Sequence, residues 1–371
     1  MMSKVRLGDY VRIRTGKLDA NASDQNGKYP FFTCSIAPLC INTYSYDCEC
    51  VLVAGNGDLN VKYYNGKFDA YQRTYIVESL NNKLLTVPYL YRFMEKYIET
   101  LRNISIGGVI KYIKLGNLTE ANINLPTVSK QNEIVDVISN VDNLIKEAEQ
   151  QLADLDILVK SRFVEMFGDP IRNDKFWPSS KLKDVTTKIG SGATPKGGKE
   201  SYPNEGISFI RSLNVHDGLF EFKDLAHLTE DQAKLLNNVT IEQSDVLLNI
   251  TGASVARTCV VPDEILPARV NQHVSIIRCN KNFLNSTFIN RQFLSDSFKR
   301  ILLNMGEAGG ATRQAITKQQ LEDTIVIVPP ITLQKEYASF VTQVDKSKLA
   351  IQQSLDELET LKKSLMQQYF G

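Results

Sequence analysis

The chain has 371 residues, 43% of them hydrophobic, and a formal net charge of +1 at pH 7. This length suggests two or three domains with ordinary packed cores. A dedicated DNA binder often has a clear basic excess, so the overall charge neither supports nor excludes nucleic acid, and any basic surface must be local. No run of about 18 apolar residues predicts a membrane span, and no signal-peptide pattern is present, so we expect a cytoplasmic location.

Four of the six cysteines lie between positions 34 and 50, which raises the question of a zinc site. Structural zinc sites usually show paired C-x2-4-C knuckles, whereas Cys48-Glu49-Cys50 is a C-x-C. This motif lies in a segment, Tyr46 to Val53, whose pattern predicts a strand, where alternate residues share one face. We therefore expect small buried hydrophobic side chains and no metal site.

In chain order, short β-branched and apolar runs bounded by turn residues predict strands in both halves. A helical pattern follows at Pro88 to Arg102, and a second one at Ser286 to Met305. The pattern in each half therefore predicts a globular unit of mixed α and β structure. The predicted strands are Cys50–Val53, Thr74–Val77, Val246–Asn249, Val274–Arg278 and Thr324–Val328.

After each globular unit, apolar residues recur in alternating steps of four and three, which is the spacing of a heptad seam in a long helix. Lys348 and Lys362 interrupt the second seam. Two amphipathic helices lying on globular cores are the alternative, but the polar outer faces and the period near 3.5 favour a coiled coil. The predicted seam residues are Ile134, Ile138, Val141, Ile145, Leu152, Leu155, Val341, Val344, Ile351, Leu355 and Leu358.

The chain repeats itself. The shift from Gln131 to Gln334, 203 positions, also takes Phe167-Gly168 to Phe370-Gly371. Earlier segments repeat with varying gaps, as a shared framework with divergent loops would. Residues 51–57 resemble 246–252, residues 71–74 resemble 271–274, and residues 106–108 resemble 309–311.

We therefore predict an α+β protein with four parts. These are a globular domain at residues 1–128, a central coiled-coil helix at 129–170, a second globular domain at 171–330, and a C-terminal coiled-coil helix at 331–371.

Catalytic motifs do not emerge from the sequence. The glycine-rich segment 190–199 does not match a phosphate loop, because Gly198 stands where the lysine is required. Pro195 likewise stands at the third glycine of a dinucleotide fingerprint. The Asn-Pro-Pro-aromatic segment of amino-methyltransferases and the H-E-x-x-H spacing of zinc proteases are also missing. We therefore expect no catalytic residues and no cofactor bound by this chain.

The order of globular unit, heptad helix, globular unit and heptad helix resembles the specificity subunit of type I restriction–modification systems over essentially the whole chain. Residues 66–75, 250–257 and 270–274 carry phrases typical of that family. Many members share these phrases, so they identify the family without identifying a DNA target.

The resemblance implies two target-recognition domains separated by a pair of long antiparallel coiled-coil helices with a pseudo-twofold repeat. It also implies double-stranded DNA as partner, two methyltransferase (M) subunits and, for cleavage, nuclease/translocase (R) subunits. Those partners would use S-adenosylmethionine, ATP and Mg²⁺. Because the two domains differ in sequence, we expect an asymmetric, split target whose spacing depends on helix length.

Base reading requires polar side chains on loops that reach a groove. Gln72 and Gln272 occur in both copies, so a framework role is equally open for them, and the arginines are alternatively phosphate contacts that position without specifying. The candidate DNA-binding residues are Thr33, Asn56, Lys62, Gln72, Arg73 and Lys111 in the first unit and Arg211, Asn214, Asn249, Arg257, Gln272, His273, Arg313 and Gln314 in the second.

Two other classes remain as alternatives. One is a self-sufficient nuclease or methyltransferase, and the other is a coiled-coil scaffold without DNA recognition.

Overall fold

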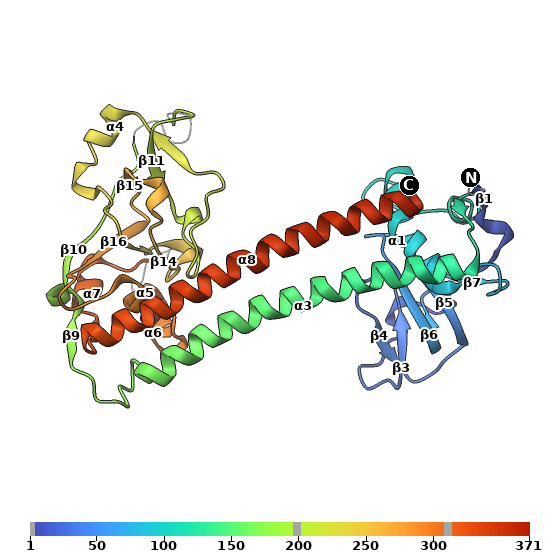
Figure 1. The fold of residues 1–371 in the computed structure, drawn as a ribbon, viewed down its shortest axis with the longest axis horizontal. Coiled ribbons are helices and arrows are strands. Elements are labelled where there is room, and N and C mark those ends of the chain that lie inside the picture. Colours follow the sequence, from blue (N-terminus) through green and yellow to red (C-terminus); the bar gives the residue numbers. More distant parts are fainter. Residues whose placement is uncertain (1–3, 196–201, 308–313) are drawn as a thin grey trace. The chain divides into compact units, whose positions relative to one another are not determined.

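The computed structural model describes residues 4–195, 202–307 and 314–371. It forms two compact units, the first made of residues 1–150 and 351–371 and the second of residues 151–350. Two long helices, α3 (Val128–Phe167) and α8 (Ile331–Phe370), each contribute residues to both units (Figure 1).

The first unit is built on a six-stranded sheet with the order β2-β7-β5-β6-β3-β4. Helix α1 (Val87–Ile104) packs on strands β5, β6 and β7 and has a proline in its first turn, where a missing N–H costs nothing. The strands are β2 (Val11–Thr15), β3 (Tyr29–Phe32), β4 (Leu39–Ile41), β5 (Tyr46–Ala54), β6 (Val61–Ala70) and β7 (Thr74–Ser79); β1 (Lys4–Arg6) pairs with β8 (Asn122–Asn124), and α2 (Leu115–Thr119) precedes β8.

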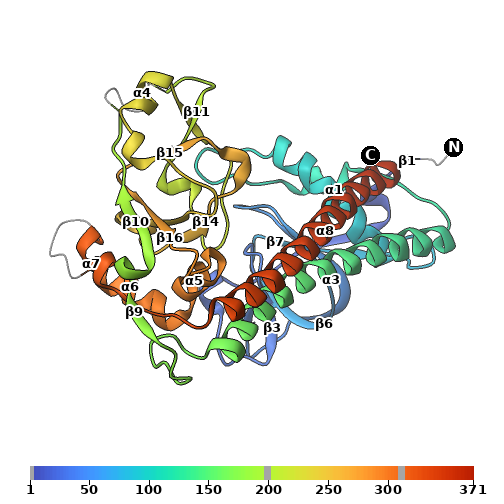
Figure 2. The same cartoon turned by 60° about the vertical axis from the view of Figure 1, so that its left-hand side comes forward.

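The second unit contains a four-stranded sheet with the order β10-β16-β13-β14 and two smaller sheets. Figure 2 shows α5 and α6 on one side of the larger sheet and β11 and β15 on the other. The elements are β9 (Ser179–Lys181), β10 (Thr186–Ser191), β11 (Ile207–Ile210), β12 (Ala226–Leu228), α4 (Glu230–Lys234), β13 (Val246–Asn249), β14 (Thr258–Val260), β15 (Ala268–Val270), β16 (Val274–Cys279), α5 (Ser286–Leu294), α6 (Asp296–Glu307), α7 (Lys318–Asp323) and β17 (Ile325–Ile327).

The central strands of both units are buried on both faces. In the first unit Val51 belongs to the core under α1, while its neighbour Leu52 belongs to a second core on the other face. In the second unit Leu247 and Leu248 divide in the same way. Side chains alternate between the faces of a strand, so burial on both faces explains why these strands are continuous apolar runs.

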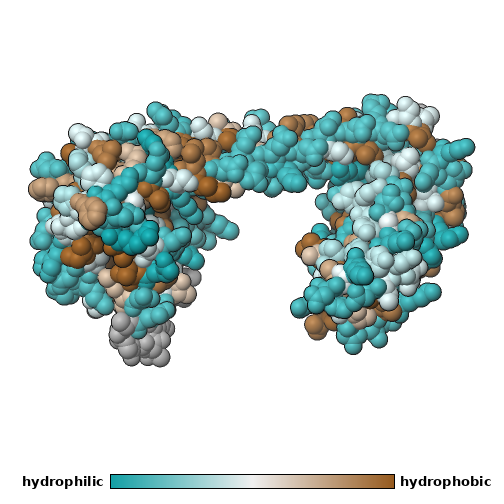
Figure 3. Space-filling model, turned by 90° about the horizontal axis from the view of Figure 1, so that it is seen from below, coloured by the Kyte–Doolittle hydropathy of each residue, from teal (hydrophilic) through white to brown (hydrophobic). Residues whose placement is uncertain are grey.

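The two long helices are antiparallel within each unit. In the first unit the beginning of α3, with Ile134 and Ile138, shares a core with Met366 near the end of α8. In the second unit the end of α3, with Phe163, shares a core with Tyr337 near the beginning of α8. All predicted seam residues are buried or half-buried, and the exposed surface of the helices seen in Figure 3 is mostly hydrophilic.

The two lysines that interrupt the seam form ion pairs between the helices. Lys362 Nζ lies 2.6 Å from Asp142 Oδ1 in the first unit. Lys348 Nζ lies 2.7 Å from Asp156 Oδ1 in the second unit. The aliphatic stems of these lysines remain half-buried along the seam while the charged ends are paired.

A buried glutamine fixes the start of each long helix. Gln131 and Gln334 are both 0% exposed. Gln131 donates from Nε2 to the carbonyl oxygens of Leu84 (2.7 Å) and Pro126 (2.9 Å) and accepts from the Thr86 N–H (2.8 Å).

Gln334 makes the corresponding bonds in the second unit. Its Nε2 donates to the carbonyl oxygens of Phe283 (2.9 Å) and Pro329 (2.7 Å), and its Oε1 accepts from the Asn285 N–H (2.9 Å). The glutamine that recurs in the sequence thus has the same structural role in both units, and we call Gln131 and Gln334 the two clamps.

One predicted helix is wrong in extent. The stretch Ser286 to Met305 forms two helices, α5 and α6, because Ser295 has an extended backbone (ψ 143°). Its hydroxyl donates to the Gln292 carbonyl (2.7 Å), which competes with continued helix. The five predicted strands lie in or around β5, β7, β13, β16 and β17. Within the described ranges, no helix is both long and apolar enough to cross a membrane.

Candidate nucleic-acid interface

Three loops of the first unit are joined by backbone hydrogen bonds. We call residues 55–57, 71–73 and 106–113 the first loop cluster. The Gly55 N–H donates to the Arg73 carbonyl (2.8 Å), the Gly57 N–H to the Lys111 carbonyl (2.9 Å), and the Ile113 N–H to the Gly55 carbonyl (2.9 Å). These segments are far apart in sequence, and the fold brings them to one end of strands β5 and β7.

The second unit repeats this arrangement in residues 250–252, 271–273 and 314–316, the second loop cluster. The Ile250 N–H donates to the His273 carbonyl (2.9 Å), the Gly252 N–H to the Gln314 carbonyl (2.9 Å), and the Ile316 N–H to the Ile250 carbonyl (2.8 Å). The bonds correspond one to one with those of the first cluster.

A glycine at the same position explains part of this conservation of shape. Gly57 has φ +72° and Gly252 has φ +73°, a left-handed conformation that glycine adopts at no steric cost. Among the described residues, a Cβ added at either position would meet nothing within 4 Å. Backbone conformation therefore favours glycine here, and the space outside it is open to a partner.

Four predicted residues of the first unit lie in the first loop cluster: Asn56, Gln72, Arg73 and Lys111. Gln72, Arg73 and Lys111 are exposed and Asn56 is half-buried. Gln72 Nε2 donates to Asp19 Oδ1 (2.8 Å), which ties this side chain to a neighbouring loop.

Thr33 and Lys62 lie outside the first loop cluster, and the link to it is Cys34, whose Sγ lies 3.6 Å from the Arg73 carbonyl oxygen. Asn60 Nδ2 donates to the Cys34 carbonyl (2.8 Å), and Lys62 Nζ donates to Asn60 Oδ1. Thr33 is 8% exposed, and its hydroxyl lies 2.7 Å from the Ser35 hydroxyl. Burial lowers the pKa of the Lys62 ammonium, so an anion placed beside it would stabilise its charged form.

Two asparagines predicted in the second unit are fully buried. Asn214 Nδ2 donates to the Glu221 carbonyl (2.9 Å), and Asn249 Nδ2 donates to the Ser212 carbonyl (2.8 Å). Both are 0% exposed and support the loops from below. Neither amide is presented to a partner in this structure.

The other residues predicted in the second unit lie at or near its loop cluster. Gln272 is exposed; its Oε1 accepts from the Thr194 hydroxyl, and its Nε2 lies 3.1 Å from His273 Nε2. Arg211, Arg257, His273 and Gln314 are half-buried. Arg211 donates to the Asp224 carbonyl and lies over the Tyr202 ring, 5.8 Å from its centroid. Arg313 lies outside the described residues.

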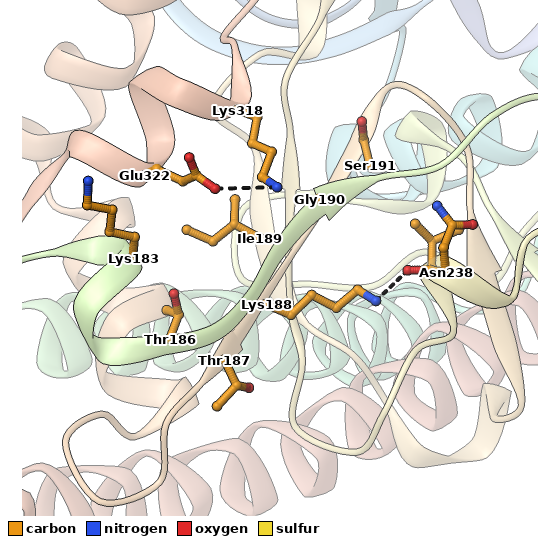
Figure 4. Close-up of a pocket in the computed structure, with 11 residues that line it drawn as sticks. Lys183, Thr186, Thr187, Lys188, Ile189, Gly190, Ser191, Asn238, Lys318 and Glu322 are labelled. Atoms are coloured by element: carbon orange, nitrogen blue, oxygen red, sulfur yellow. Dashed lines mark hydrogen bonds and ion pairs between the residues drawn. The ribbon is translucent and has the colours of Figure 1, made fainter.

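A basic groove along the edge strand β10 was not predicted from the sequence. Figure 4 shows Lys183, Lys188 and Lys318 around a groove of about 570 Å³, with the hydroxyls of Thr186 and Thr187. Lys318 is 3.4 Å from Glu322, and Lys188 donates to the Asn238 carbonyl. The only signal in the sequence is the Thr-Thr-Lys run at 186–188, because the other two lysines come from distant segments. Ammonium and hydroxyl groups of this kind suit phosphate oxygens.

The cysteines occupy varied environments. Cys50 is buried in β5, and burial raises the pKa of the Cys259 and Cys279 thiols to about 12. Cys48 and Cys34 are half-buried, and Cys40 is exposed. Over residues 4–195, 202–307 and 314–371, no group of three or more His, Cys, Asp or Glu side chains could hold a metal ion.

Two related loop clusters, held by the same backbone bonds and carrying different polar and basic side chains, define a protein built from two copies of one domain type. A family model described as type I restriction modification DNA specificity domain matches residues 2–155 and 175–360. The chain therefore belongs to this family, and it is a type I specificity subunit, which is not an enzyme by itself.

Similar proteins agree with this assignment. The EcoDI specificity subunit of Escherichia coli is 40% identical over 152 residues, which cover 41% of this chain and 33% of that relative. The chain thus aligns with about a third of that protein. The MjaVIII specificity subunit of Methanocaldococcus jannaschii is 20% identical over 385 residues, covering 98% of this chain and 90% of the relative.

Solved structures share the fold. The type I S subunit from M. genitalium has a TM-score of 0.64 at 15% identity, covering 100% of this chain and 96% of that one. A chain from a study of complex assembly and conformational transition of the type I restriction–modification system has a TM-score of 0.58 at 17% identity, covering 99% and 97%. The fold class predicted from sequence, two mixed domains with a pair of long helices, is confirmed.

Proposed function

We propose that this subunit reads an asymmetric, bipartite sequence in double-stranded DNA, one half-site with each loop cluster. The observation that carries the proposal is the pair of matched backbone frameworks with unmatched side chains. Arg73 stands where the second unit has His273, and Lys111 stands where it has Gln314. Readers with the same shape and different polar groups should recognise different bases.

The side chains divide into two kinds of contact. Arg73 and Lys111 are exposed at the first cluster and differ from their counterparts, so they are the strongest base-contact candidates. Gln72 and Gln272 are also exposed, but they are the same in both units, so they do not explain a difference between the half-sites. The lysines of the β10 groove are suited to phosphates, which position a protein on DNA without reading its sequence. A net charge of +1 then leaves DNA binding to local basic surfaces.

The partners proposed are two M subunits and, for cleavage, R subunits, acting in the cytoplasm. A structural relative comes from a study of the assembly of a type I complex, which supports this expectation. In such a complex the partners would use S-adenosylmethionine for adenine methylation, or ATP and Mg²⁺ for cleavage. This chain would recognise the DNA sequence at which they act.

The decisive experiment is a domain exchange. Residues 181–328 are replaced with the equivalent segment of another family member, and methylated motifs are mapped in cells that carry the M subunits and either version of the gene. We expect one half-site to change completely and the other to stay. A change in both half-sites would show that the two clusters are not independent readers.

The same experiment addresses the alternatives. Cells without the gene should lose the methylated motif, whereas an unrelated scaffold would leave methylation unchanged. The purified chain should neither methylate nor cleave DNA alone; turnover absent from mock-purified controls would support an enzyme instead.

A further inference from the structure

The most exposed apolar side chains of the first loop cluster lie at the tip of residues 106–113. Val109 is 104% exposed and Ile110 is 62% exposed. Single exposed apolar side chains are normal on a protein surface, whereas a group of them at one place favours an interaction site.

The tip projects from a fixed base. The Ile106 N–H donates to the Tyr112 carbonyl (3.1 Å), and the Tyr112 N–H donates to the Ile106 carbonyl (2.8 Å), which closes the loop. Gly107 has φ +118°, and a Cβ there would lie 2.4 Å from the Ile110 carbonyl oxygen. The position of the tip therefore depends on glycine at 107.

Two basic residues of the proposed reading surface belong to the same loop cluster as the tip. Lys111 follows the two apolar residues directly and is itself bonded through its carbonyl to Gly57. Arg73 is exposed on the adjacent loop of the same cluster. An apolar tip in the same cluster as cationic side chains suits a duplex, because the cations are attracted to the anionic backbones and an apolar wedge can enter a base step once it is unstacked.

The size of the tip distinguishes DNA from a protein partner. A specific protein interface uses roughly 20–30 residues and about 800 Å² on each side. The tip offers two apolar side chains, flanked by glycines and a lysine. One or two inserted apolar side chains are, in contrast, enough to open a base step.

We propose that Val109 and Ile110 form an apolar wedge that enters the duplex at the first half-site and unstacks one base step there. The proposal rests on the proposed function, because it assumes that the first loop cluster faces DNA. The wedge belongs to the first unit alone: the repeat aligns Val109 and Ile110 with Thr312 and Arg313, which are polar. The two half-sites would then be recognised by different means.

The test uses the chain assembled with the M subunits and a duplex that carries the target mapped by methylome sequencing. 2-Aminopurine, an adenine analogue whose fluorescence rises when it is unstacked, replaces one adenine at a time within or beside each half-site. The methylated adenines are left unlabelled, because base flipping for methylation would raise the signal by itself.

For the wild type, we expect a severalfold rise at one step of the first half-site. The double variant Val109→Ala, Ile110→Ala should lose this rise. Its affinity should fall by about tenfold or less, because lost apolar burial is offset by stacking that is no longer broken. Val109→Ile with Ile110→Leu should restore the rise.

Leu80→Ala is the matched control. Leu80 is an exposed apolar residue (58%) that follows β7 at the end opposite to the 71–73 loop, and its loss should leave the fluorescence rise unchanged. Thermal unfolding and assembly with the M subunits are measured for every variant.

The outcomes separate the two proposals. A double variant that binds the target and still gives the rise overturns the wedge while leaving the proposed function intact. A folded double variant that fails to assemble with the M subunits also overturns it, because the tip is then a protein contact. A wild-type complex that binds no duplex specifically overturns the proposed function and the wedge with it.

Discussion

In the first unit, Gln131 ties the start of α3 to the segment before α1, and in the second unit Gln334 ties the start of α8 to the segment before α5 through equivalent bonds. The loop clusters behave differently. Their backbone bonds correspond, but Arg73 and Lys111 are matched by His273 and Gln314. At Arg73 and Lys111 the backbone holds the loops and the side chains differ between the copies, whereas the glutamine that itself bridges two segments is the same in both.

Helix residues that are buried in a domain core should contribute more to the free energy of unfolding than residues on the exposed side of the same helix. Ile138→Asp should have the largest effect, because Ile138 is 0% exposed in the core of the first unit and the new carboxylate would be unpaired. We expect a loss of about 3 kcal/mol or more in the free energy of unfolding, measured by denaturant titration.

Leu144→Asp serves as the control for this prediction, since Leu144 lies on the same helix and is 50% exposed. Leu355→Asp should fall between them, because Leu355 is 8% exposed but belongs to the helix pair rather than to a large core. An unchanged melting temperature for Ile138→Asp would mean that α3 does not pack as described.

Replacing either clamp should test whether the two units are equivalent. Gln131→Leu and Gln334→Leu each leave a backbone N–H and two carbonyl groups without their partner. At about 1 kcal/mol for each of the three unsatisfied groups, we expect losses of about 3 kcal/mol. Gln353→Leu, on the exposed face of α8, should cost little. A large difference between the two clamp variants would contradict the equivalence.

Removing an ion pair between α3 and α8 should lower the free energy of unfolding more in the first unit than in the second. Asp142 Oδ2 lies 2.6 Å from Arg92, and Asp142 Oδ1 lies 2.6 Å from Lys362, so Asp142→Asn weakens contacts with two partly buried cations. We expect about 1–3 kcal/mol for this change. Asp156, which is 57% exposed and pairs with Lys348, should cost less than about 1 kcal/mol when changed to Asn. Equal effects would show that burial does not control these pairs.

Substitution of exposed residues that we propose to contact bases should have the smallest effect on stability. Gln272→Ala should leave the melting temperature within about 1 °C but relax the methylated motif at one position, because Gln272 is exposed at the second cluster. Asn249→Ala should do the reverse, lowering stability by about 1–2 kcal/mol, because its amide supports the Ser212 carbonyl below the surface. Motif mapping and thermal unfolding of both variants check the distinction. A stable Asn249→Ala protein with an altered methylated motif would mean that Asn249 contacts bases.

Much of the architecture followed from sequence pattern. The heptad spacing predicted α3 and α8, and alternating cores explain the apolar runs of β5 and β13. The helix predicted at Ser286 to Met305 failed at Ser295, because a local side-chain bond outweighs an apolar period that continues on both sides of it.

The candidate site was only partly visible in sequence. Repeat positions pointed to loops that the fold does join by hydrogen bonds, such as those of Gly57 with Lys111 and Gly252 with Gln314. The pattern alone did not separate Asn249, which is buried beneath a loop, from Gln272, which is exposed on one. It also missed the β10 groove, whose lysines come from positions as distant as 183 and 318.

The sequence by itself determined the repeat, the long helices and the family, because periodicity and recurring phrases are properties of neighbouring positions along the chain. Only the tertiary structure decided which polar side chains are framework, which cations gather in a groove, and that Val109 and Ile110 stand exposed at the tip of a closed loop. Exposure and proximity depend on contacts between distant segments, and a local pattern does not encode them.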